Sequence, residues 1–197
     1  MGDEKFWNAA NFVTIARFLI LIALIIMLNW DSKILSFAAT ILIPFVFFLD
    51  WLDGTLARKL KVVTNFGSYA DVVADRATEI LLWVFFLSKG LVPFWVVFII
   101  IVRGLITDAI RTKAQISNIS VYDLTSSKIG KILVNSKFFI FLTAFCKLLL
   151  FTLLGLYTAL NLNIILVATN ILVYAALIIN LLRGVPVIYD GIKLFSK

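Results

Sequence analysis

The sequence contains no histidine and only one cysteine, Cys146. Without histidine, the chain has no histidine general base, no histidine-ligated zinc site and no Ser-His-Asp triad. The single cysteine cannot form an intramolecular disulfide, and its position in an apolar run favours a small buried hydrophobic side chain. Any acid–base or metal chemistry must therefore depend on carboxylates.

Charged residues are also scarce, at 15% of the 197 residues, whereas 62% are hydrophobic and the mean hydropathy is +1.07. A soluble domain usually has about half of its residues apolar. The excess here is too large for one small core to bury, so lipid must form part of the surroundings. The composition predicts an all-α integral membrane protein.

Six apolar stretches come close to the roughly 20 residues that a helix needs to cross a bilayer. No linker, low-complexity tract or internal repeat separates them, which predicts one membrane domain over residues 1–197 with six transmembrane helices. The stretches are Phe12–Leu28, Ile34–Leu52, Ala70–Leu87, Leu91–Ile110, Val134–Leu154 and Ile164–Leu182.

The first stretch could be mistaken for a secretory signal, but no small-residue cleavage site follows it. A retained transmembrane helix is therefore expected. Before this stretch, the segment Lys5–Asn11 mixes Phe6 and Trp7 with polar residues, which is typical of a short interfacial helix.

The basic residues predict the topology. With six spans and a cytoplasmic N-terminus, 15 of the 18 lysines and arginines lie at cytoplasmic ends, and only Lys33, Lys89 and Lys147 remain for the other side. This asymmetry satisfies the positive-inside rule and predicts that both termini face the cytoplasm. The net charge of +7 then reflects contact with anionic lipid headgroups, so we expect no nucleic-acid partner.

Six acidic residues lie within the second to fourth stretches or at their cytoplasmic ends. An ionisable group at the centre of a membrane helix costs about 2.5–3.5 kcal/mol on insertion scales. Several carboxylates in adjacent helices therefore need compensating cations. The residues are Asp50, Asp53, Asp71, Asp75, Glu79 and Asp108.

Four of these carboxylates form two pairs. Asp50 and Asp53 are spaced i,i+3 on one expected helix. Asp71 and Asp75 are spaced i,i+4 on the next, so each pair shares a helix face. If the two helices pack antiparallel across a turn at Arg58–Phe66, the pairs converge at one depth. Oxygen ligands suit Mg²⁺, Mn²⁺ or Ca²⁺, and water and phosphate would fill the open positions.

Small residues and an arginine accompany the aspartates. Gly54, Ala57 and Gly67 would let a nucleotide and its pyrophosphate approach the backbone closely. Arg58 can bind phosphate with a bidentate fork. The small residues would also suit tight helix packing alone, which is common in membranes. Tight packing does not account for the four aspartates.

The complete pattern, D-x2-D-G-x2-A-R-x8-G-x3-D-x3-D, runs from Asp50 to Asp75. It resembles the signature of the CDP-alcohol phosphatidyltransferase family, and every fixed position of that signature is present. The resemblance implies an enzyme that transfers a phosphatidyl-type group from a CDP-linked lipid to a small alcohol and releases CMP. It also implies six spans in the cell inner or plasma membrane with the active site facing the cytoplasm, and it is compatible with a homodimer.

The resemblance further implies roles for individual residues. Asp50, Asp53 and Asp71 would ligate two Mg²⁺ or Mn²⁺ ions. Asp75 would contact the second ion and act as the general base for the acceptor hydroxyl. The metals would stabilise charge on the pyrophosphate, make CMP a better leaving group and favour in-line attack on the lipid-side phosphorus. The residues that would hold the CDP portion are Gly54, Ala57, Arg58, Thr64 and Gly67.

Residues outside the signature bear on the acceptor alcohol. Asn11, Thr14 and Arg17 resemble the N-x2-T-x2-R segment of phosphatidylglycerophosphate synthases and their relatives. Basic residues further along could form a cationic pocket for an acceptor that carries phosphate. They could also be the ordinary cytoplasmic anchors of a membrane protein. These residues are Arg103, Arg111, Lys128 and Lys131.

The identity of the acceptor stays open at this point. The Gly130-Lys131 step resembles that of glycerophosphate-using members, but Leu133 and Val134 stand where Lys-Thr usually follows. Arg76, after the last motif aspartate, resembles inositol-phosphate-using members. We expect glycerol 3-phosphate first, inositol phosphate second and serine or another unphosphorylated alcohol third.

A protein of another class, a cation transporter or channel, could use buried aspartates as an ion pathway. Its carboxylates would be spread through the thickness of the membrane. The acidic residues of this chain instead cluster toward the expected cytoplasmic ends, which favours an interfacial enzyme. Metal-dependent binding of CMP would separate the two classes.

Overall fold

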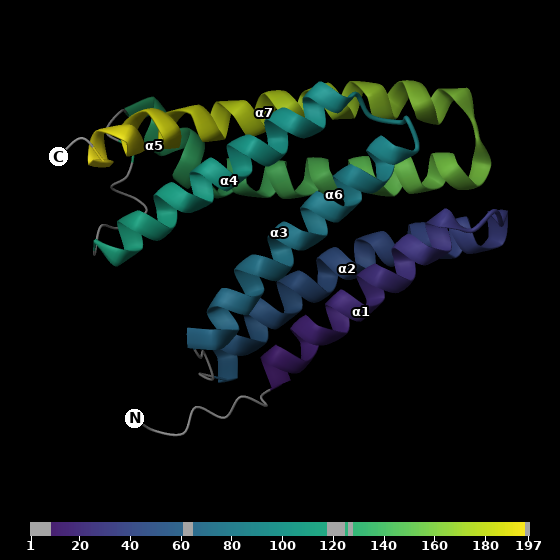
Figure 1. Ribbon diagram of the computed structural model, residues 1–197, viewed down its shortest axis with the longest axis horizontal. Coiled ribbons are helices and arrows are strands. Elements are labelled where there is room, and N and C mark those ends of the chain that lie inside the picture. Colours follow the sequence, from purple (N-terminus) through teal and green to yellow (C-terminus); the bar gives the residue numbers. More distant parts are fainter. Residues whose placement is uncertain (1–8, 61–64, 118–124, 126–127, 196–197) are drawn as a thin grey trace. The chain divides into compact units, whose positions relative to one another are not determined.

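The computed structural model describes residues 9–60, 65–117, 125 and 128–195. Side chains are described at residues 15–49, 73–114, 116–117, 125 and 130–193. Within these ranges all regular structure is helical, which confirms the predicted all-α class (Figure 1). The helices are α1 (Ala9–Asn29), α2 (Lys33–Leu60), α3 (Asn65–Ser88), α4 (Phe94–Ile116), α5 (Lys128–Asn135), α6 (Lys137–Leu160) and α7 (Asn163–Phe195).

Each of the six apolar stretches lies on a helix, but the boundaries differ from prediction. The helix that carries the second stretch continues to Leu60, and α3 already begins at Asn65, so the predicted turn at Arg58–Phe66 was too wide. A loss of apolar character marks where a helix leaves a membrane, whereas Arg58, Lys59 and Leu60 are all good helix formers. The fifth stretch is also interrupted, because α5 ends at Asn135 before α6 begins.

The chain forms two compact units. The first comprises residues 1–91 and 151–167, and the second comprises residues 92–150 and 168–197. The helices α6 and α7 therefore contribute to both units. The predicted single membrane domain over residues 1–197 stays a prediction, as does the interfacial helix at Lys5–Asn11, of which the structure describes only the last three residues, within α1.

In the first unit, α1 and α2 form a hairpin because only three residues connect two helices that pack together (Figure 1). Two contacts show that α1 and α3 run in the same direction. Arg17 meets Asp75 near the middle of both helices, and Asn29 meets Lys89 at their ends. Because α1 is antiparallel to α2 and parallel to α3, α2 and α3 are antiparallel to each other.

The core of the first unit is aromatic. Phe151 of α6 stacks with Phe86 of α3 at a ring-centroid distance of 6.1 Å and meets the edge of Trp83 at 5.1 Å. Phe151 also stacks on Phe47 of α2. One turn further along α6, Gly155 packs against Ile43, one turn earlier in α2. The described part of α6 in this unit is thus antiparallel to α2.

In the second unit, α4 and α7 run in the same direction. Gly184 of α7 lies against Arg103 of α4, and seven residues later Gly191 lies against Ile110. Val187, between the two glycines, packs in a small core with Ile110 of α4 and Val134 of α5. The end of α7 is therefore held against α4 and the short helix α5.

Two turns have the backbone that their sequences favour. After α3, the N–H of Gly90 donates to Leu87 O and the N–H of Leu91 donates to Phe86 O. This is a Schellman motif, and Gly90 adopts the positive φ of 70° that it requires. Asn161 ends α6 with a φ of 53°, a conformation that asparagine tolerates better than most residues.

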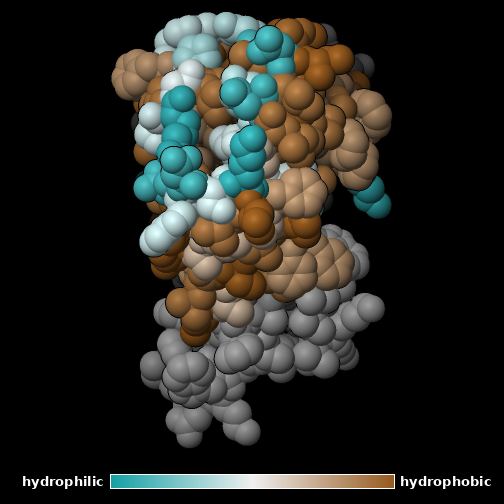
Figure 2. All heavy atoms as spheres, turned by 90° about the vertical axis from the view of Figure 1, so that its right-hand side faces the viewer, coloured by the Kyte–Doolittle hydropathy of each residue, from teal (hydrophilic) through white to brown (hydrophobic). Residues whose placement is uncertain are grey.

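Large apolar side chains face outward along most of the described helices. Hydrophobic side chains make up much of the coloured surface in Figure 2, and most of the hydrophilic ones lie in its upper left part. By length and composition, α6 and residues 163–193 of α7 qualify as membrane spans, with mean hydropathies of 2.3 and 2.4. The apolar segments Ile15–Asn29 and Lys33–Leu49 are shorter. These features support a membrane protein, and the six transmembrane spans stay a prediction.

Candidate functional site

The four motif aspartates lie on two antiparallel helices of the first unit. Asp50 and Asp53 are on the C-terminal part of α2, and Asp71 and Asp75 are on the N-terminal part of α3. All four positions are helical, so the predicted i,i+3 and i,i+4 spacings do place each pair on one helix face. The side chains of Asp50, Asp53 and Asp71 lie outside the described residues.

Asp75 is the motif aspartate whose side chain is described. Its Oδ1 lies 3.1 Å from Nη1 of Arg17, which comes from the middle of α1. The carboxylate side chain is 52% exposed, whereas the arginine side chain is only 2% exposed. Sequence reasoning selected both residues for different reasons but did not predict this pair, because nothing in the spacing reveals which residues of α1 face α3.

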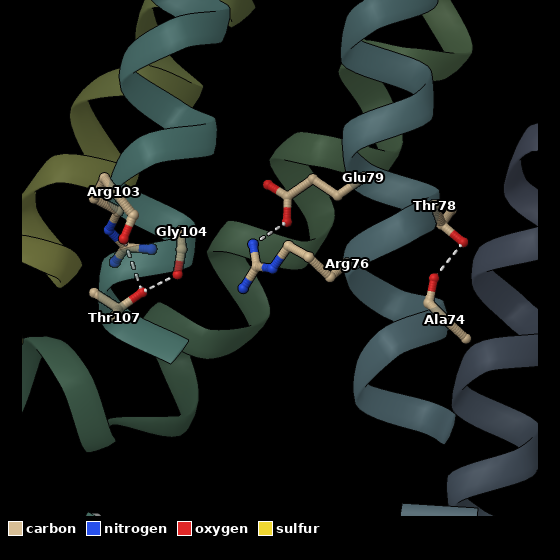
Figure 3. Close-up of polar contacts among 7 residues, drawn as sticks. All are labelled: Ala74, Arg76, Thr78, Glu79, Arg103, Gly104 and Thr107. Carbon is tan, nitrogen blue, oxygen red and sulfur yellow. Dashed lines mark hydrogen bonds and ion pairs between the residues drawn. The ribbon is translucent and has the colours of Figure 1, made fainter. Parts of the chain in front are cut away.

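The next turn of α3 has its own polar contacts. Arg76 Nη1 and Glu79 Oε2 form an ion pair of 3.0 Å, and the Thr78 hydroxyl donates to Ala74 O at 2.9 Å (Figure 3). Glu79, one of the six clustered acidic residues, is thus balanced by a cation of its own helix.

For several predicted site residues the structure describes only the helical backbone, and others lie outside the described residues. Among the side chains that the structure describes, which do not include those of Asp50, Asp53 and Asp71, no three acidic, cysteine or histidine residues gather as a metal site. The exposed Asp75 carboxylate and the helical spacing fit an oxygen-ligated divalent ion. The residues whose side chains are outside the description are Asn11, Thr14, Gly54, Ala57, Arg58, Thr64, Gly67 and Lys128.

The second unit brings predicted acceptor residues against α7. The guanidinium of Arg103 lies directly on the backbone of Gly184, where a β-carbon would overlap it. One turn along α4, the Thr107 hydroxyl donates to Gly104 O at 2.8 Å (Figure 3). Lys131 is exposed on α5.

Arg183 of α7 is a residue that sequence reasoning missed as a site candidate. It donates from Nη1 to the Thr143 hydroxyl at 2.9 Å and from Nη2 to Val134 O at 3.3 Å. Its Nε is buried and has no hydrogen-bond partner within the described residues. Arg111 lies close enough for the two positive charges to interact. From sequence, Arg183 resembled an ordinary cytoplasmic anchor, and only the packing of α7 distinguishes it.

These features define an all-helical, membrane-associated protein with carboxylates concentrated on one antiparallel pair of helices. The profile of the CDP-alcohol phosphatidyltransferase family matches residues 7–182, so the chain belongs to that family.

Similar proteins include three that carry the name CDP-diacylglycerol–glycerol-3-phosphate 3-phosphatidyltransferase. The protein from Bacillus subtilis is 34% identical over 117 residues, which cover 53% of this chain and 61% of the relative. That from Haemophilus influenzae is 32% identical over 108 residues, covering 53% and 58%. That from Pseudomonas fluorescens is 36% identical over 77 residues, covering 35% of each. The chain thus spans about three-fifths of the length of the first two.

Proposed function

We propose that this protein transfers the phosphatidyl group of CDP-diacylglycerol to glycerol 3-phosphate and releases CMP in phospholipid biosynthesis. The observation that carries the proposal is the complete aspartate signature at residues 50–75, inside the family match and on two antiparallel helices. The relatives named as glycerol-3-phosphate phosphatidyltransferases favour this acceptor.

The carboxylates of α2 and α3 would organise the reaction. Asp50, Asp53 and Asp71 would hold two Mg²⁺ or Mn²⁺ ions, with Asp75 in contact with the second. When bound, such ions neutralise charge on the pyrophosphate and improve CMP as a leaving group. Asp75 takes the proton of the acceptor hydroxyl. The hydroxyl oxygen bonds to the lipid-side phosphorus as the bond from that phosphorus to the CMP oxygen breaks.

The nucleotide would lie along the same pair of helices. Gly54, Ala57 and Gly67 leave room for CDP near the backbone, and Arg58 offers a charged fork to its phosphates. Thr64 would contact the nucleotide from the connection between α2 and α3. Helical residues at Arg58 and Gly67 support this placement, since both ends of the connection belong to rigid elements.

The cations of the second unit would hold the phosphate of the acceptor. Arg103, Arg111, Lys128 and Lys131 are the residues that we assign to this role. Arg183 supports the assignment, because its partners in the described part of the chain are neutral oxygens and its neighbour Arg111 is positively charged. A partly buried guanidinium in such surroundings is stabilised by an anion.

The same proposal includes six membrane spans with both termini and the active site at the cytoplasmic face. Helix directions support it. The first and third spans, α1 and α3, are parallel, as are the fourth and sixth, α4 and α7, while α2 and α6 are antiparallel. Successive spans cross a membrane in opposite directions, so odd-numbered spans must be parallel to each other and antiparallel to even-numbered ones. A homodimer in the inner or plasma membrane is part of the proposal.

An acceptor panel tests the function. Purified protein in nanodiscs would receive CDP-diacylglycerol and Mg²⁺ with glycerol 3-phosphate, inositol phosphate or serine, and CMP release would be followed. We expect the highest kcat/KM with glycerol 3-phosphate. Preference for inositol phosphate or serine would move the protein to another branch of the family. A cation transporter would release no CMP with any acceptor and would not bind CMP when metal is added.

A further inference from the structure

We propose that Arg17 is a positioning residue that holds the Asp75 carboxylate in the orientation needed by the acceptor hydroxyl. The geometric basis is the 3.1 Å ion pair between Arg17 Nη1 on α1 and Asp75 Oδ1 on α3. The inference rests on the proposed function, because it gives the partner of Asp75 a task in that reaction.

The two partners differ in exposure in the way that a positioning contact requires. At 2% exposure the Arg17 side chain is enclosed by the helices of the first unit, whereas the Asp75 side chain, at 52%, is accessible from outside. A buried guanidinium is strongly destabilising when it loses its charge partner, so the contact is favoured in the folded protein. Asp75 is thus held from the protein interior while remaining reachable by a substrate.

The surroundings make Arg17 a rigid support. Leu21 and Leu24, one and two turns further along α1, are completely buried. At the far ends of the same two helices, Lys89 Nζ donates to Asn29 Oδ1 at 3.0 Å. The position of Arg17 relative to Asp75 is therefore set by helix packing, which is far less adaptable than a loop.

Holding one carboxylate oxygen has a direct consequence for the other. The Asp75 carboxylate can rotate about its terminal torsion, for which the rotamer wells are broad. A charge-assisted bond from a planar guanidinium to Oδ1 restricts that rotation and fixes the direction in which Oδ2 points. Catalytic groups need this kind of restraint, because small errors in position are costly in rate.

The kinetic test uses Arg17→Gln and Arg17→Lys. Arg17→Gln should lower kcat for CMP release about ten- to a hundredfold, the usual effect of removing a group that orients a functional side chain. Metal-dependent CMP binding, measured by calorimetry, should change less than about threefold, since the nucleotide contacts remain. Arg17→Lys should recover part of kcat because it keeps the charge but not the fork. The matched control is Lys89→Gln, which removes the exposed contact between the same helices and should behave as wild type.

A double-mutant cycle decides whether Arg17 acts through Asp75. In the Asp75→Asn background, Arg17→Gln should change the residual rate less than about twofold, because the group that it orients is gone. The same loss in both backgrounds would overturn the proposal. A fall in CMP binding that parallels the fall in kcat would also overturn it, since Arg17 would then support the nucleotide site or the fold as a whole.

Unfolding temperatures test the pairing of Arg17 with Asp75 independently of turnover. Asp75→Asn removes the carboxylate from a buried guanidinium, so its unfolding temperature should lie below that of the Arg17→Gln, Asp75→Asn double variant. If the double variant unfolds at the same or a lower temperature, the pair does not constrain Asp75 and the proposal fails. A wild-type protein that releases no CMP with any acceptor would contradict the proposed function instead, whatever the order of these temperatures.

Discussion

Arg17 in the first unit and Arg183 in the second lie in apolar helices but have opposite surroundings. Arg17 is almost completely buried and forms an ion pair with the carboxylate of Asp75. Arg183 is half-buried, donates to the Thr143 hydroxyl and the Val134 carbonyl, and interacts with the positive charge of Arg111. One charge is balanced by a carboxylate of the protein, whereas the other meets neutral oxygens and a like charge.

This difference separates two kinds of chemistry. Burying a guanidinium is unfavourable unless a counter-charge or good hydrogen bonds accompany it. In the first unit the counter-charge is a residue of the aspartate signature, so the arginine fits a supporting role behind a carboxylate. In the second unit the described partners suit an anion supplied by a substrate. In the proposed function, the metal and base chemistry therefore belongs to the carboxylates of the first unit, and phosphate recognition to the cations of the second.

The largest effect on activity is expected from removing the carboxylates of the first unit. Asp50→Asn, Asp53→Asn and Asp71→Asn should each lower CMP release more than about a hundredfold, because a bound metal contributes several kcal/mol of charge stabilisation. Metal-dependent CMP binding should fall as well. Asp31→Asn, in the exposed turn after α1, is the control. Full activity in any of the three variants, or in excess chelator, would contradict the metal assignment.

Removing the cations of the second unit should have a smaller and more selective effect. Arg103→Ala, Arg111→Ala, Lys131→Ala and Arg183→Ala should each raise the KM for glycerol 3-phosphate about ten- to a hundredfold, the range expected for one charge-assisted hydrogen bond. CDP-lipid binding should be nearly unchanged. Lys113→Ala removes an exposed cation from the end of α4 and should leave KM unaltered. Wild-type KM values in all four variants would show that these cations only anchor the helices at the cytoplasmic face and do not bind the acceptor.

Two glycines of α7 separate the effect of helix packing from the effect of the Arg103 charge. Gly184→Ala would place a β-carbon on the Arg103 guanidinium, whereas Gly191→Ala would place one 2.5 Å from Ile110 Cγ2. Both changes overpack the α4–α7 contact and should destabilise the protein by about 1–3 kcal/mol. Only Gly184→Ala should also raise the acceptor KM, by about threefold to tenfold, because it displaces a charge. Equal kinetic effects would show that helix packing alone is at work.

The smallest effect is expected from Gly155→Ala in the first unit. Its β-carbon would lie 2.8 Å from Ile43 Cδ1, the far end of a flexible side chain. It would also lie 3.0 Å from Thr40 Oγ1, which donates a hydrogen bond to Ser36 O. A loss of about 1 kcal/mol in stability is expected for this mild overpacking. The KM values for both substrates should stay unchanged. A thermal unfolding scan and a kinetic comparison with wild type check both expectations. A selective change in the acceptor KM would contradict the assignment of acceptor binding to the second unit.

Hydropathy and spacing were sufficient for the helical class and for the helices that carry the signature. Composition does not show where a helix ends in water, which is why α2 continues to Leu60 beyond its apolar stretch. The break before Lys137 was missed although the polar residues Asn135, Ser136 and Lys137 mark it, because the apolar residues on both sides were read as one stretch.

Contacts between helices were the part that sequence could not provide. Arg17 and Asp75 are 58 positions apart, and their pairing depends on how α1 and α3 align, which a single sequence does not encode in any local pattern. Arg183 illustrates the reverse problem, because a cation at the end of an apolar run is typical of any membrane protein. Its contacts with Thr143 and Val134 are recognised only when α7 is packed on its neighbours.

The stoichiometry of the products tests whether the protein is a transferase with a phosphorylated acceptor. Wild-type protein in nanodiscs would be given CDP-diacylglycerol, glycerol 3-phosphate and Mg²⁺, with CMP and the lipid product measured together by mass spectrometry. We predict one phosphatidylglycerophosphate for each CMP, and neither product after chelation of the metal. CMP accompanied by phosphatidic acid in place of the glycerophosphate lipid, or CMP release that is insensitive to chelation, would contradict the account.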